Sequence, residues 1–525
     1  MGSCTYNNSP SLGWVVQKFG GTSVGKFPLK IAQDIVKASL SKNRVVVVCS
    51  ARSTGKKAEG TTSRLLGVYS KLRSVGAATV PEDEQLALIE QAKGLIADIC
   101  NDHVFAAESY VQDADLRAGL VEKVKAECQE LIEYIVAAKR FRLEINARSK
   151  DRVISFGEKL SCHYMTTLLH DAVCLLLTLF IALGVEAEYV DLCDILHTDT
   201  PADQLDASFY KSTISTFASR IAACEARVPV VTGFFGNVPG SLIDGDIGRG
   251  YTDLCAALCA VGLRAEELQI WKEVDGIFTA DPTKVPTARL LPSITPSEAA
   301  ELTFYGSEVI HHLTMDQVIR AHPPIPIRIK NVKNPRGTGT IVVPDPVLSA
   351  GHQLHRSRPS QLRNDLNNKK PKRPTAVTIK DNITVINVHS NKRSISHGFF
   401  ARVFSILDRQ SISVDLISTS EVHVSLAIHT SAIQVDAFAK AKEELEECGD
   451  VSVLTDMAIL SLVGADMKNM VGVAGRMFST LGEHYVNIEM ISQGASEINI
   501  SCVIDARDAT RAMNVLHTHL FTFLE

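Results

Sequence analysis

The residues with the clearest chemical potential form a glycine-rich turn near the N-terminus. The segment Lys18–Gly25 (KFGGTSVG) follows the apolar run Trp14–Val16 and precedes a helical pattern, so a cation and a flexible backbone come where a strand ends. Adjacent glycines allow main-chain N–H groups to converge on anionic oxygens, and Lys18 adds a charge suited to a transferring phosphoryl group. The lysine precedes the glycines, so this is not a Walker A loop. Taken alone, the motif is equally compatible with a tight strand-to-helix connection.

Three charged residues further along have the chemistry to bind an amino acid and a phosphate. Glu158 offers a carboxylate for an ammonium group, although a glutamate in the first turn of a helix is also favoured by the helix dipole. Arg249 stands between two glycines, where its guanidinium can hold a carboxylate through two hydrogen bonds. Asp253 opens the following helix, where a carboxylate is suited to an N-cap.

The elements that must position these residues have the pattern of an α/β domain. Short β-branched runs, such as Val45–Val48, Val228–Val231 and Ile327–Ile329, alternate with longer amphipathic stretches. This alternation predicts a largely parallel sheet within residues 14–343. Residues 344–375 are polar and partly basic, which predicts a solvated linker.

An internal repeat follows the linker. Arg402–Leu407 matches Arg476–Leu481, and Val414–Ser418 matches Ile488–Ser492, each at an offset of 74 positions. Each copy has the pattern strand, helix, strand, turn, strand and a further helix. The repeat therefore predicts two ferredoxin-like βαββαβ units, over residues 376–456 and 457–525.

Composition narrows the class of protein. A chain of 525 residues is too long for one hydrophobic core, and a net charge of −5 gives no basic surface for nucleic acid. The 12 cysteines show neither a C-x-x-C pair nor metal-ligand spacing, so we expect reduced thiols in a cytoplasmic enzyme and no metal held by the protein. No signal peptide is indicated, and the apolar residues 172–185 fall short of the about 20 that span a bilayer, so we expect a buried helix there and no membrane partner.

The octapeptide KFGGTSVG, taken whole, resembles the opening signature of aspartate kinases in the amino acid kinase family. Further family motifs match Val46–Ser53, Phe156–Ser161, Gly248–Asp253 and Trp271–Pro282, and the repeat resembles paired ACT domains; the similarity is greatest to fungal monofunctional enzymes. The resemblance implies an amino acid kinase fold, with helices on both faces of the sheet, followed by two ACT units. It also implies transfer of the ATP γ-phosphoryl group to the side-chain carboxylate of L-aspartate, with Mg²⁺ carried on the nucleotide.

The family motifs also assign roles to individual residues of this sequence. Lys18 and Asp253 are implied to be catalytic. The implied substrate contacts are Ser50, Thr62, Glu158 and Arg249. The implied nucleotide contacts are Gly20, Gly21, Thr22, Ser23, Lys272, Glu273, Phe278 and Asp281. A feedback effector, threonine or else lysine, is implied at the first ACT unit, through Ser396, Gly398, Phe399, Phe400, Asp415, Thr419, Ser420 and Glu421, although Gly398 could simply permit the turn and the phenylalanines could be core.

Several features depart from the family pattern. Thr283 stands where relatives commonly carry arginine, His312 replaces a usual proline, and Val173–Leu183 is foreign to the pattern, so we interpret it as translated intron sequence. One alternative function is an amino-acid sensor with an impaired kinase domain, which the retained charged residues disfavour. Another is a different amino acid kinase, such as a glutamate kinase. In either case we expect a homo-oligomer formed through ACT pairing.

Overall fold

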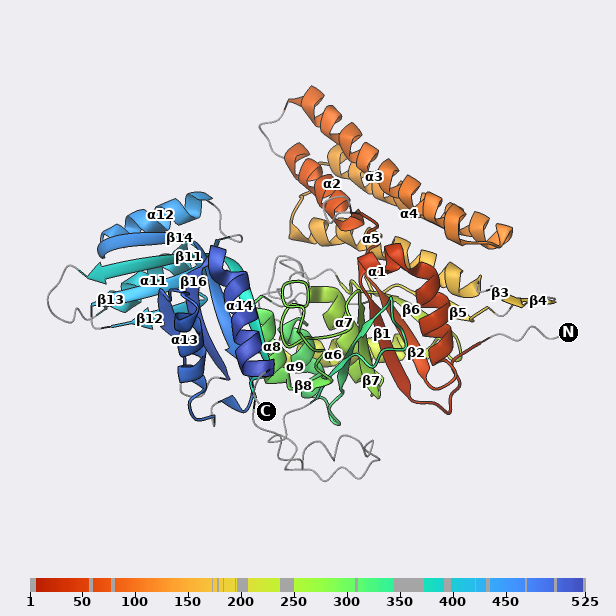
Figure 1. Ribbon diagram of the computed structural model, residues 1–525. Coiled ribbons are helices and arrows are strands. Elements are labelled where there is room, and N and C mark those ends of the chain that lie inside the picture. Colours follow the sequence, from red (N-terminus) through yellow and green to blue (C-terminus); the bar gives the residue numbers. More distant parts are fainter. Residues whose placement is uncertain are drawn as a thin grey trace. The chain divides into compact units, whose positions relative to one another are not determined.

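The computed structural model describes residues 6–55, 60–76, 81–171, 173–176, 179–182, 184–193, 195, 206–236, 250–306, 310–343, 373–390, 398–420, 422–430, 435–467, 470–494 and 498–522. The chain divides into two compact units, and each is described by itself (Figure 1). The first comprises the residues up to Gly276 together with Ile310–Val343, and the second comprises Ile277–Val309 together with the residues from Pro344. Most of the predicted linker, residues 344–372, lies outside the described residues.

A largely parallel sheet forms the centre of the first unit (Figure 1). Seven strands follow the order β5-β6-β2-β1-β7-β9-β10, and all neighbours are parallel except β9 and β10. These strands are β1 (Trp14–Phe19), β2 (Arg44–Cys49), β5 (Ala187–Val190), β6 (Val228–Thr232), β7 (Glu267–Lys272), β9 (Ile327–Asn331) and β10 (Thr340–Val342). Because β1, β2, β6 and β7 are parallel, the residues that follow them meet at one edge of the sheet, which is the edge where α/β proteins bind ligands.

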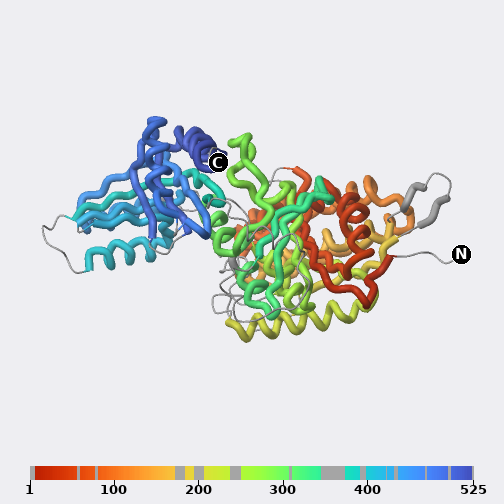
Figure 2. Tube along the Cα trace, turned by 60° about the horizontal axis from the view of Figure 1, so that its bottom comes forward, coloured from red at the N-terminus to blue at the C-terminus, as the bar shows by residue number. Residues whose placement is uncertain are grey.

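Helices cover both faces of this sheet. Helix α5 (Ala147–His170) packs on β2, β5 and β6, while α7 (Tyr251–Gly262) packs on β1, β2 and β7. Val45 and Val47 of β2 belong to the hydrophobic cluster that includes residues of α5. Val46 lies between them, so it faces the opposite side of the sheet, and it is equally buried. Strand β2 is therefore covered on both sides. The other helices are α1 (Gly21–Lys26), η1 (Lys30–Lys37), α2 (Thr61–Val75), α3 (Glu82–Tyr110), α4 (Ala114–Arg140), α6 (Ala207–Ala222) and α9 (His312–Ile319). Figure 2 shows α6 along the outside of this unit.

The long helices α3 and α4 form a hairpin that packs on α2 and α5 (Figure 1). The turn between them is fastened to the end of α5, because the carboxylate of Asp171 accepts hydrogen bonds from the backbone N–H groups of Gln112 (2.5 Å) and Asp113 (2.9 Å). Asp113 in turn caps α4 through the N–H groups of Asp115 and Leu116. The hairpin is thereby fixed to α5 at its tip as well as along its length.

The helix predicted at residues 172–185 is wrong. Strands β3 (Val173–Leu176) and β4 (Leu179–Ala182) form a two-stranded antiparallel sheet of their own. A short apolar run is compatible with a strand or with a buried helix, and the β-branched and aromatic residues Val173, Phe180 and Ile181 favour the strand. Among the helices that the structure describes, none is long and apolar enough to cross a bilayer.

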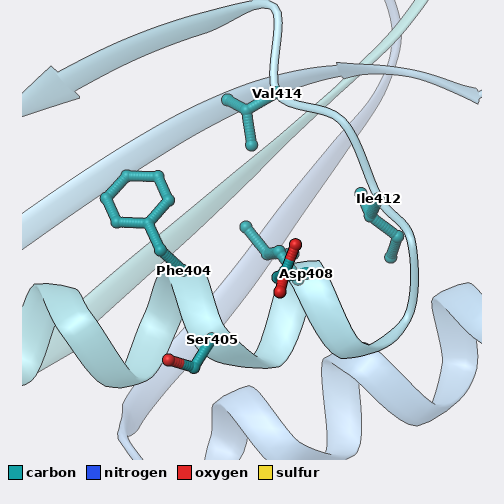
Figure 3. Close-up of a pocket in the computed structure, with 6 residues that line it drawn as sticks. Phe404, Ser405, Asp408, Ile412 and Val414 are labelled. Atoms are coloured by element: carbon teal, nitrogen blue, oxygen red, sulfur yellow. The ribbon is translucent and has the colours of Figure 1, made fainter. Parts of the chain in front are cut away.

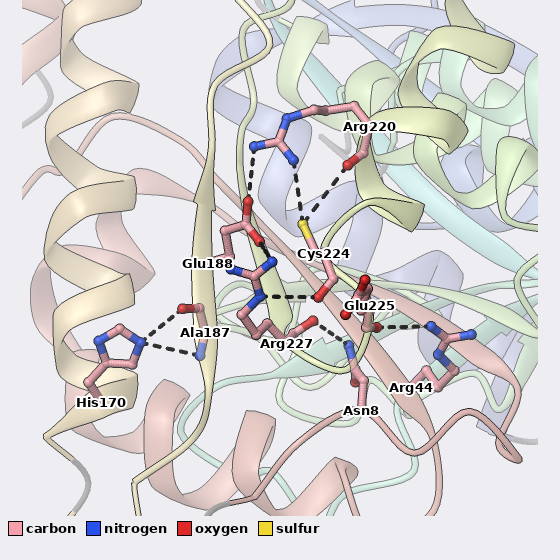
Figure 4. Close-up of polar contacts among 9 residues, drawn as sticks. All are labelled: Asn8, Arg44, His170, Ala187, Glu188, Arg220, Cys224, Glu225 and Arg227. Atoms are coloured by element: carbon pink, nitrogen blue, oxygen red, sulfur yellow. Dashed lines mark hydrogen bonds and ion pairs between the residues drawn. The ribbon is translucent and has the colours of Figure 1, made fainter.

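The chain on either side of β3 and β4 is held by contacts that do not involve them (Figure 4). The N–H of Val185 donates to the carbonyl of Leu169 (2.8 Å), so the chain leaves and returns at one point. His170 Nε2 lies 3.2 Å from the N and 2.9 Å from the O of Ala187 in β5. Glu188, also in β5, pairs with Arg220 (3.1 Å) and with Arg227 (3.0 Å). Strand β5 is therefore anchored independently of the two-stranded sheet.

The second unit is built on an antiparallel sheet with the order β12-β13-β11-β14-β16-β15. Its strands are β11 (Ala376–Ser390), β12 (Leu416–Thr419), β13 (His423–His429), β14 (Gly449–Val463), β15 (Met490–Ser492) and β16 (Asn499–Asp505). The long strands β11 and β14 pair along most of their length, with register shifts between Lys380 and Val385. Each of these two strands therefore contributes to both halves of the sheet.

The structure confirms the internal repeat. Helices α11 (Phe399–Arg409) and α13 (Val473–Glu483) begin 74 residues apart, and each follows a glycine in the left-handed region, Gly398 at φ 85° and Gly472 at φ 77°. These φ values favour glycine, because other residues pay a steric penalty there. The remaining elements of this unit are β8 (Ser293–Ile294), α8 (Pro296–Phe304), α12 (Val435–Glu446), η7 (Ala506–Asp508), α14 (Ala509–His517) and η8 (Thr518–Thr522).

Residues 277–309, which the sequence pattern places within the first domain, belong to the second unit. Ala280 and Val285 belong to a hydrophobic cluster with residues of α13 and α14. The hydroxyl of Thr279 lies 2.8 Å from Nε2 of buried His517, and that of Thr287 lies 3.1 Å from Nδ1 of the same ring. Both ring nitrogens of one histidine thus hold this segment, a long-range contact that local sequence patterns do not encode.

Candidate active site

The glycine-rich segment lies at the carboxyl end of β1, as the sequence predicted. Lys18 Nζ forms an ion pair of 2.7 Å with Oδ1 of Asp253 in α7, and the two side chains are only 13% and 16% exposed. Gly20 is the N-cap of α1 in an extended conformation, and Gly21 begins the helix. A side chain at Gly21 would collide with the carbonyl oxygen of Ala51, so this glycine allows two backbone segments to touch.

Asp253 remains ionised although it is largely buried. Burial alone would raise its pKa, but the charge of Lys18 and its hydrogen bond, together with the charges of Lys272 and His311, outweigh burial and lower the pKa. The N-cap of α7 is Gly250, so the alternative capping role for Asp253 is not observed. Asp253 is thus a fixed carboxylate that orients Lys18 at the end of a strand. This arrangement is suited to the transfer of a negatively charged group.

Ser50, Thr252 and Glu158 form a continuous chain of hydrogen bonds beside this ion pair. Ser50 Oγ donates to Thr252 Oγ1 (3.0 Å), and Thr252 Oγ1 donates to Oε1 of Glu158 (3.2 Å). The three residues come from the end of β2, from α7 and from α5, so the fold gathers them from distant parts of the chain. Thr252 had no role in the sequence prediction, although it stands inside the Gly248–Asp253 motif.

Glu158 is fully buried, and burial raises its pKa to about 8. Hydrogen bonds from Thr252, from Tyr251 and from the backbone N–H of Phe234 favour the ionised form but offset only part of the desolvation. Its second oxygen, Oε2, has no hydrogen-bond partner among the described residues. The carboxyl group is therefore neutral in most free molecules at pH 7, and an ammonium group would supply the charge that ionises it.

The predicted nucleotide residues of β1 and β7 lie together. Ser23 Oγ donates to Oε1 of Glu273 at 2.5 Å, and Phe19 stacks on Trp271 with 6.1 Å between ring centroids. Lys272 ends β7 and adds positive charge near Asp253. Thr22, the second residue of α1, completes the segment.

The structure does not bring the other predicted substrate and nucleotide residues together in the same way. Thr62 is the second residue of α2 and half-buried, and Arg249 lies outside the described residues. Phe278 and Asp281 belong to the second unit, where Asp281 accepts hydrogen bonds from the N–H (2.9 Å) and the hydroxyl (2.7 Å) of Thr283. Thr283 therefore closes a turn with Asp281.

His311 is a second residue that sequence reasoning missed. Its ring lies where a side chain at position 250 would be, so Gly250 permits the close approach. Its charge helps to lower the pKa of Asp253. The sequence did contain one signal, the glycine-rich stretch that ends in Gly250. Such a stretch predicts close packing, but it does not identify His311 as the residue that packs there.

Three of the predicted effector residues lie at the start of α11. Gly398 is the N-cap, Phe399 is buried in the cluster with Val403, and Phe400 is 37% exposed. Thr419 ends β12, and the N–H of Ser420 donates to the carbonyl of His423 at 2.9 Å. The predicted Ser396 and Glu421 lie outside the described residues.

Asp415 is the charged member of the predicted effector set. Lys380 Nζ donates to its Oδ1 at 2.7 Å, and the side chain of Asp415 is 7% exposed. Its Oδ2 is buried without a hydrogen-bond partner in the described part of the chain. This oxygen could accept a hydrogen bond from a ligand.

A separate hollow of about 470 Å³ lies on the other end of α11 (Figure 3). It is lined by Phe404, Ser405, Leu407, Asp408, Ile412 and Val414. None of these is a predicted effector residue, so the hollow and the predicted effector loop are different places on the same helix.

Comparisons with known proteins identify the family to which the chain belongs. The model of the amino acid kinase family matches residues 13–331, and that of an ACT domain matches residues 460–520. The chain is 56% identical to aspartate kinase FUB3 of Gibberella fujikuroi over 97% of this chain and 98% of the relative, and 52% identical to aspartokinase of Schizosaccharomyces pombe over 98% and 94%. Among solved structures, it is similar to E. coli aspartokinase III in complex with aspartate and ADP, with a TM-score of 0.64, 26% identity and coverage of 97% and 99%. The chain belongs to the amino acid kinase family and, within it, to the aspartate kinases.

Proposed function

We propose that this aspartate kinase transfers the ATP γ-phosphoryl group to the side-chain carboxylate of L-aspartate through Lys18 and Asp253. The observation that carries the proposal is their 2.7 Å ion pair at the carboxyl end of β1, beside the hydrogen-bond chain from Ser50 to Glu158. A carboxylate is already a competent nucleophile at neutral pH, so no covalent enzyme intermediate is required. Lys18 and the N–H groups of Gly20 and Gly21 would neutralise charge on the phosphoryl oxygens, while Asp253 holds Lys18 in place.

In this proposal, two residues of opposite charge recognise the substrate. Glu158 pairs with the α-ammonium of aspartate, and Arg249 holds its α-carboxylate in a two-point contact. Ser50 and Thr62 line the pocket. The buried and unpartnered Oε2 of Glu158 supports the first contact, because a desolvated carboxylate needs a cation to be stable.

Nucleotide binding is proposed for two groups of residues, which are Gly20, Gly21, Thr22 and Ser23, and Lys272, Glu273, Phe278 and Asp281. Asp253 and Glu273 already bond to Lys18 and to Ser23, so Mg²⁺ would be held chiefly by the nucleotide phosphates, with these carboxylates nearby. When bound, Mg²⁺ would offset the negative charge of the phosphates. Thr283 stands where the family pattern has an arginine. Lys284 is unsuited to take over the role of that arginine, since it pairs with Asp381 at 3.3 Å.

Feedback inhibition by threonine is proposed at the first ACT unit, as a control on the first step of threonine and methionine formation. The N–H groups at Gly398 would bind the effector carboxylate at the start of α11, and Oδ2 of Asp415 would accept from its ammonium group. The similarity to E. coli aspartokinase III supports regulation by an amino acid, since that protein was solved in complex with lysine and aspartate in a T-state. Lysine is therefore the second candidate. A cytoplasmic homo-oligomer paired through its ACT units is the proposed form of the enzyme.

A hydroxamate assay for the acyl phosphate tests the proposal directly. ATP-dependent product should form with L-aspartate and not with glutamate or N-acetylglutamate, and threonine should inhibit it while lysine does not. Arg249→Ala should raise KM for aspartate and leave KM for ATP close to wild type. Product formation with glutamate in preference to aspartate would overturn the substrate, and a loss of ATP binding in Arg249→Ala would reverse the assignment of the pocket.

A further inference from the structure

The loop that follows β2, residues 50–53, contacts several segments of the catalytic region in the first unit. The N–H of Ser50 donates to the carbonyl of Phe19 (3.1 Å), and the N–H of Ser53 donates to the carbonyl of Gly21 (3.0 Å). Glycine is required at position 21 because the carbonyl of Ala51 occupies the space of a side chain. The loop therefore lies directly against the phosphate-binding segment.

The same loop also contacts the two helices that carry the proposed substrate residues. A side chain at Gly157, the neighbour of Glu158, would press on the Cβ of Ala51 at 2.8 Å. The carbonyl of Arg52 accepts a hydrogen bond from the N–H of Thr61 at the start of α2 (3.3 Å). The N–H of Arg52 donates to Ser161 Oγ in α5 (2.8 Å). A small displacement of this loop would thus move Ser50, Gly21 and the start of α2 together.

The side chain of Arg52 anchors the loop from the other side. It is 3% exposed, and its Nη1 donates to Oδ2 (2.7 Å) and to the carbonyl oxygen (3.2 Å) of Asp102 in α3. The guanidinium also lies 5.8 Å from the ring centroid of Tyr164 in α5. A buried guanidinium is unfavourable unless it is paired, so this ion pair must form when the loop occupies its observed position.

The surroundings leave Asp102 as the main counter-ion of Arg52. Arg52 Nε is buried without a hydrogen-bond partner in the described chain. Neighbouring His103 is buried, and burial, followed by the charge of Arg52, lowers its pKa to about 4, so it stays neutral and adds no second cation. Asp102 itself is 28% exposed, so it can be hydrated if Arg52 is removed, whereas Arg52 cannot be hydrated if Asp102 is removed.

We propose that Arg52 is a positioning residue for phosphoryl transfer, because its ion pair with Asp102 of the α3–α4 hairpin fixes the 50–53 loop against Gly21 and Gly157. The inference rests on the proposed function, in which Ser50 and Gly21 contact the substrates. It gives the hairpin a role in the reaction, although none of the residues that contact substrate comes from it.

The test compares stability with activity in four variants of the full chain. Arg52→Met should fold and lower kcat/KM for aspartate by about 30-fold or more. Asp102→Asn should lower the thermal midpoint more than Arg52→Met does, because it leaves the guanidinium buried without a counter-ion. The double variant Arg52→Met/Asp102→Asn should recover the midpoint of Arg52→Met while its kcat/KM stays low. Arg64→Met is the matched control, since Arg64 also reaches α3, at the carbonyl of Asp98 (3.4 Å), from an exposed position, and its kcat/KM should stay within about twofold of wild type.

The dissociation of activity from stability separates positioning from a purely structural role. If kcat/KM recovers together with the thermal midpoint in the double variant, or if Arg52→Met keeps wild-type kcat/KM, the proposal is overturned. Arg52→Lys keeps the charge with a single donor group, and it should show an intermediate kcat/KM even if Arg52→Met does not fold; wild-type kcat/KM in Arg52→Lys would also count against the proposal. Ser50→Ala tested in parallel reports on the proposed function instead, since an unchanged kcat/KM there would remove Ser50 from the pocket whatever Arg52 does.

Discussion

Raising the pH from 6 to 8 should strengthen the binding of aspartate, because Glu158 must lose a proton before it can pair with the substrate's α-ammonium group. Burial raises the pKa of Glu158 to about 8 in the free protein. A neutral carboxyl group cannot form the charge-assisted hydrogen bond on which recognition depends. If Glu158 makes the proposed contact, most free enzyme molecules at neutral pH should bind aspartate weakly.

The expected size of the effect follows from this pKa. With a pKa of about 8, about one molecule in a hundred has an ionised Glu158 at pH 6 and about one in ten at pH 7. Apparent affinity falls in proportion to the competent fraction, so kcat/KM for aspartate should rise about tenfold between pH 6 and pH 7 and level off above about pH 8. Glu158→Gln should give a flat profile, lower by about 10- to 100-fold at pH 8, since a hydrogen bond to a charged group contributes about 1.5–3 kcal/mol.

Two measurements check this prediction. Initial rates at saturating ATP give kcat/KM for aspartate, which reports the titration of the free enzyme, and KM for ATP serves as the control that should not follow the same curve. Calorimetry in buffers of different protonation enthalpy gives the proton count, which should be about 0.9 released per aspartate bound at pH 7 in the wild type and about none in Glu158→Gln. A wild-type kcat/KM that stays level from pH 6 to 8, or binding without proton release, would refute the reasoning.

The same pKa has the opposite effect on the stability of the free protein. The native state keeps a proton on Glu158 that the unfolded chain releases above its ordinary pKa of 4.5. Because the native state binds more protons in this window, the free energy of unfolding should fall as the pH rises from about 4.5 to about 8. Denaturant unfolding at pH 5 and pH 8 without aspartate should show this decline in the wild type and a smaller one in Glu158→Gln.

Three further outcomes are expected. Lys18→Met and Asp253→Ala should each lower kcat by about 100-fold or more with unchanged circular dichroism spectra, because each removes one member of the 2.7 Å ion pair; near-normal kcat in either variant would contradict their roles. Deletion of Val173–Leu183 should leave kcat and the thermal midpoint close to wild type, because β5 is anchored by Leu169 and His170, whereas an unfolded product would show that the segment is integral; sequencing of the transcript decides whether it is intron-derived. Gly398→Asp and Ser420→Phe should remain active but resist threonine, and inhibition as in the wild type would place the effector elsewhere.

Features that are local in the sequence were predictable. The Lys18–Gly25 segment combines the end of a strand, a glycine pair and a cation within eight residues, and two matching segments at an offset of 74 reveal the repeat. Both were found where expected, with Gly398 and Gly472 in the same backbone conformation. For the repeat the physical cause is local, because a glycine in the left-handed region begins each helix, whereas glycine at position 21 is required by the close approach of the Ala51 carbonyl.

Features that depend on distant segments were not predictable. The chain from Ser50 through Thr252 to Glu158 joins three elements, and a hydroxyl group at Thr252 carries no sign of its partners until the sheet brings them together. The ion pair of Arg52 and Asp102 was also not predictable from the sequence, because a charged residue is usually solvated. The error at residues 172–185 has another cause, since hydrophobicity alone does not distinguish a short buried helix from a strand pair.

The proposed charge state of the free site predicts that the enzyme selects an amino acid over a simple dicarboxylate. Asp253 is ionised but paired with Lys18, and Glu158 holds its proton, so neither presents an unpaired negative charge to an anionic substrate. Aspartate brings the ammonium group that makes ionisation of Glu158 favourable, whereas succinate, which has two carboxylates and no ammonium group, would be repelled by Glu158 once that residue ionises. Succinate should therefore inhibit competitively with an inhibition constant that rises from pH 6 to pH 8, while KM for aspartate falls over the same range. Parallel pH trends for the two ligands would mean that Glu158 does not face the α-ammonium position.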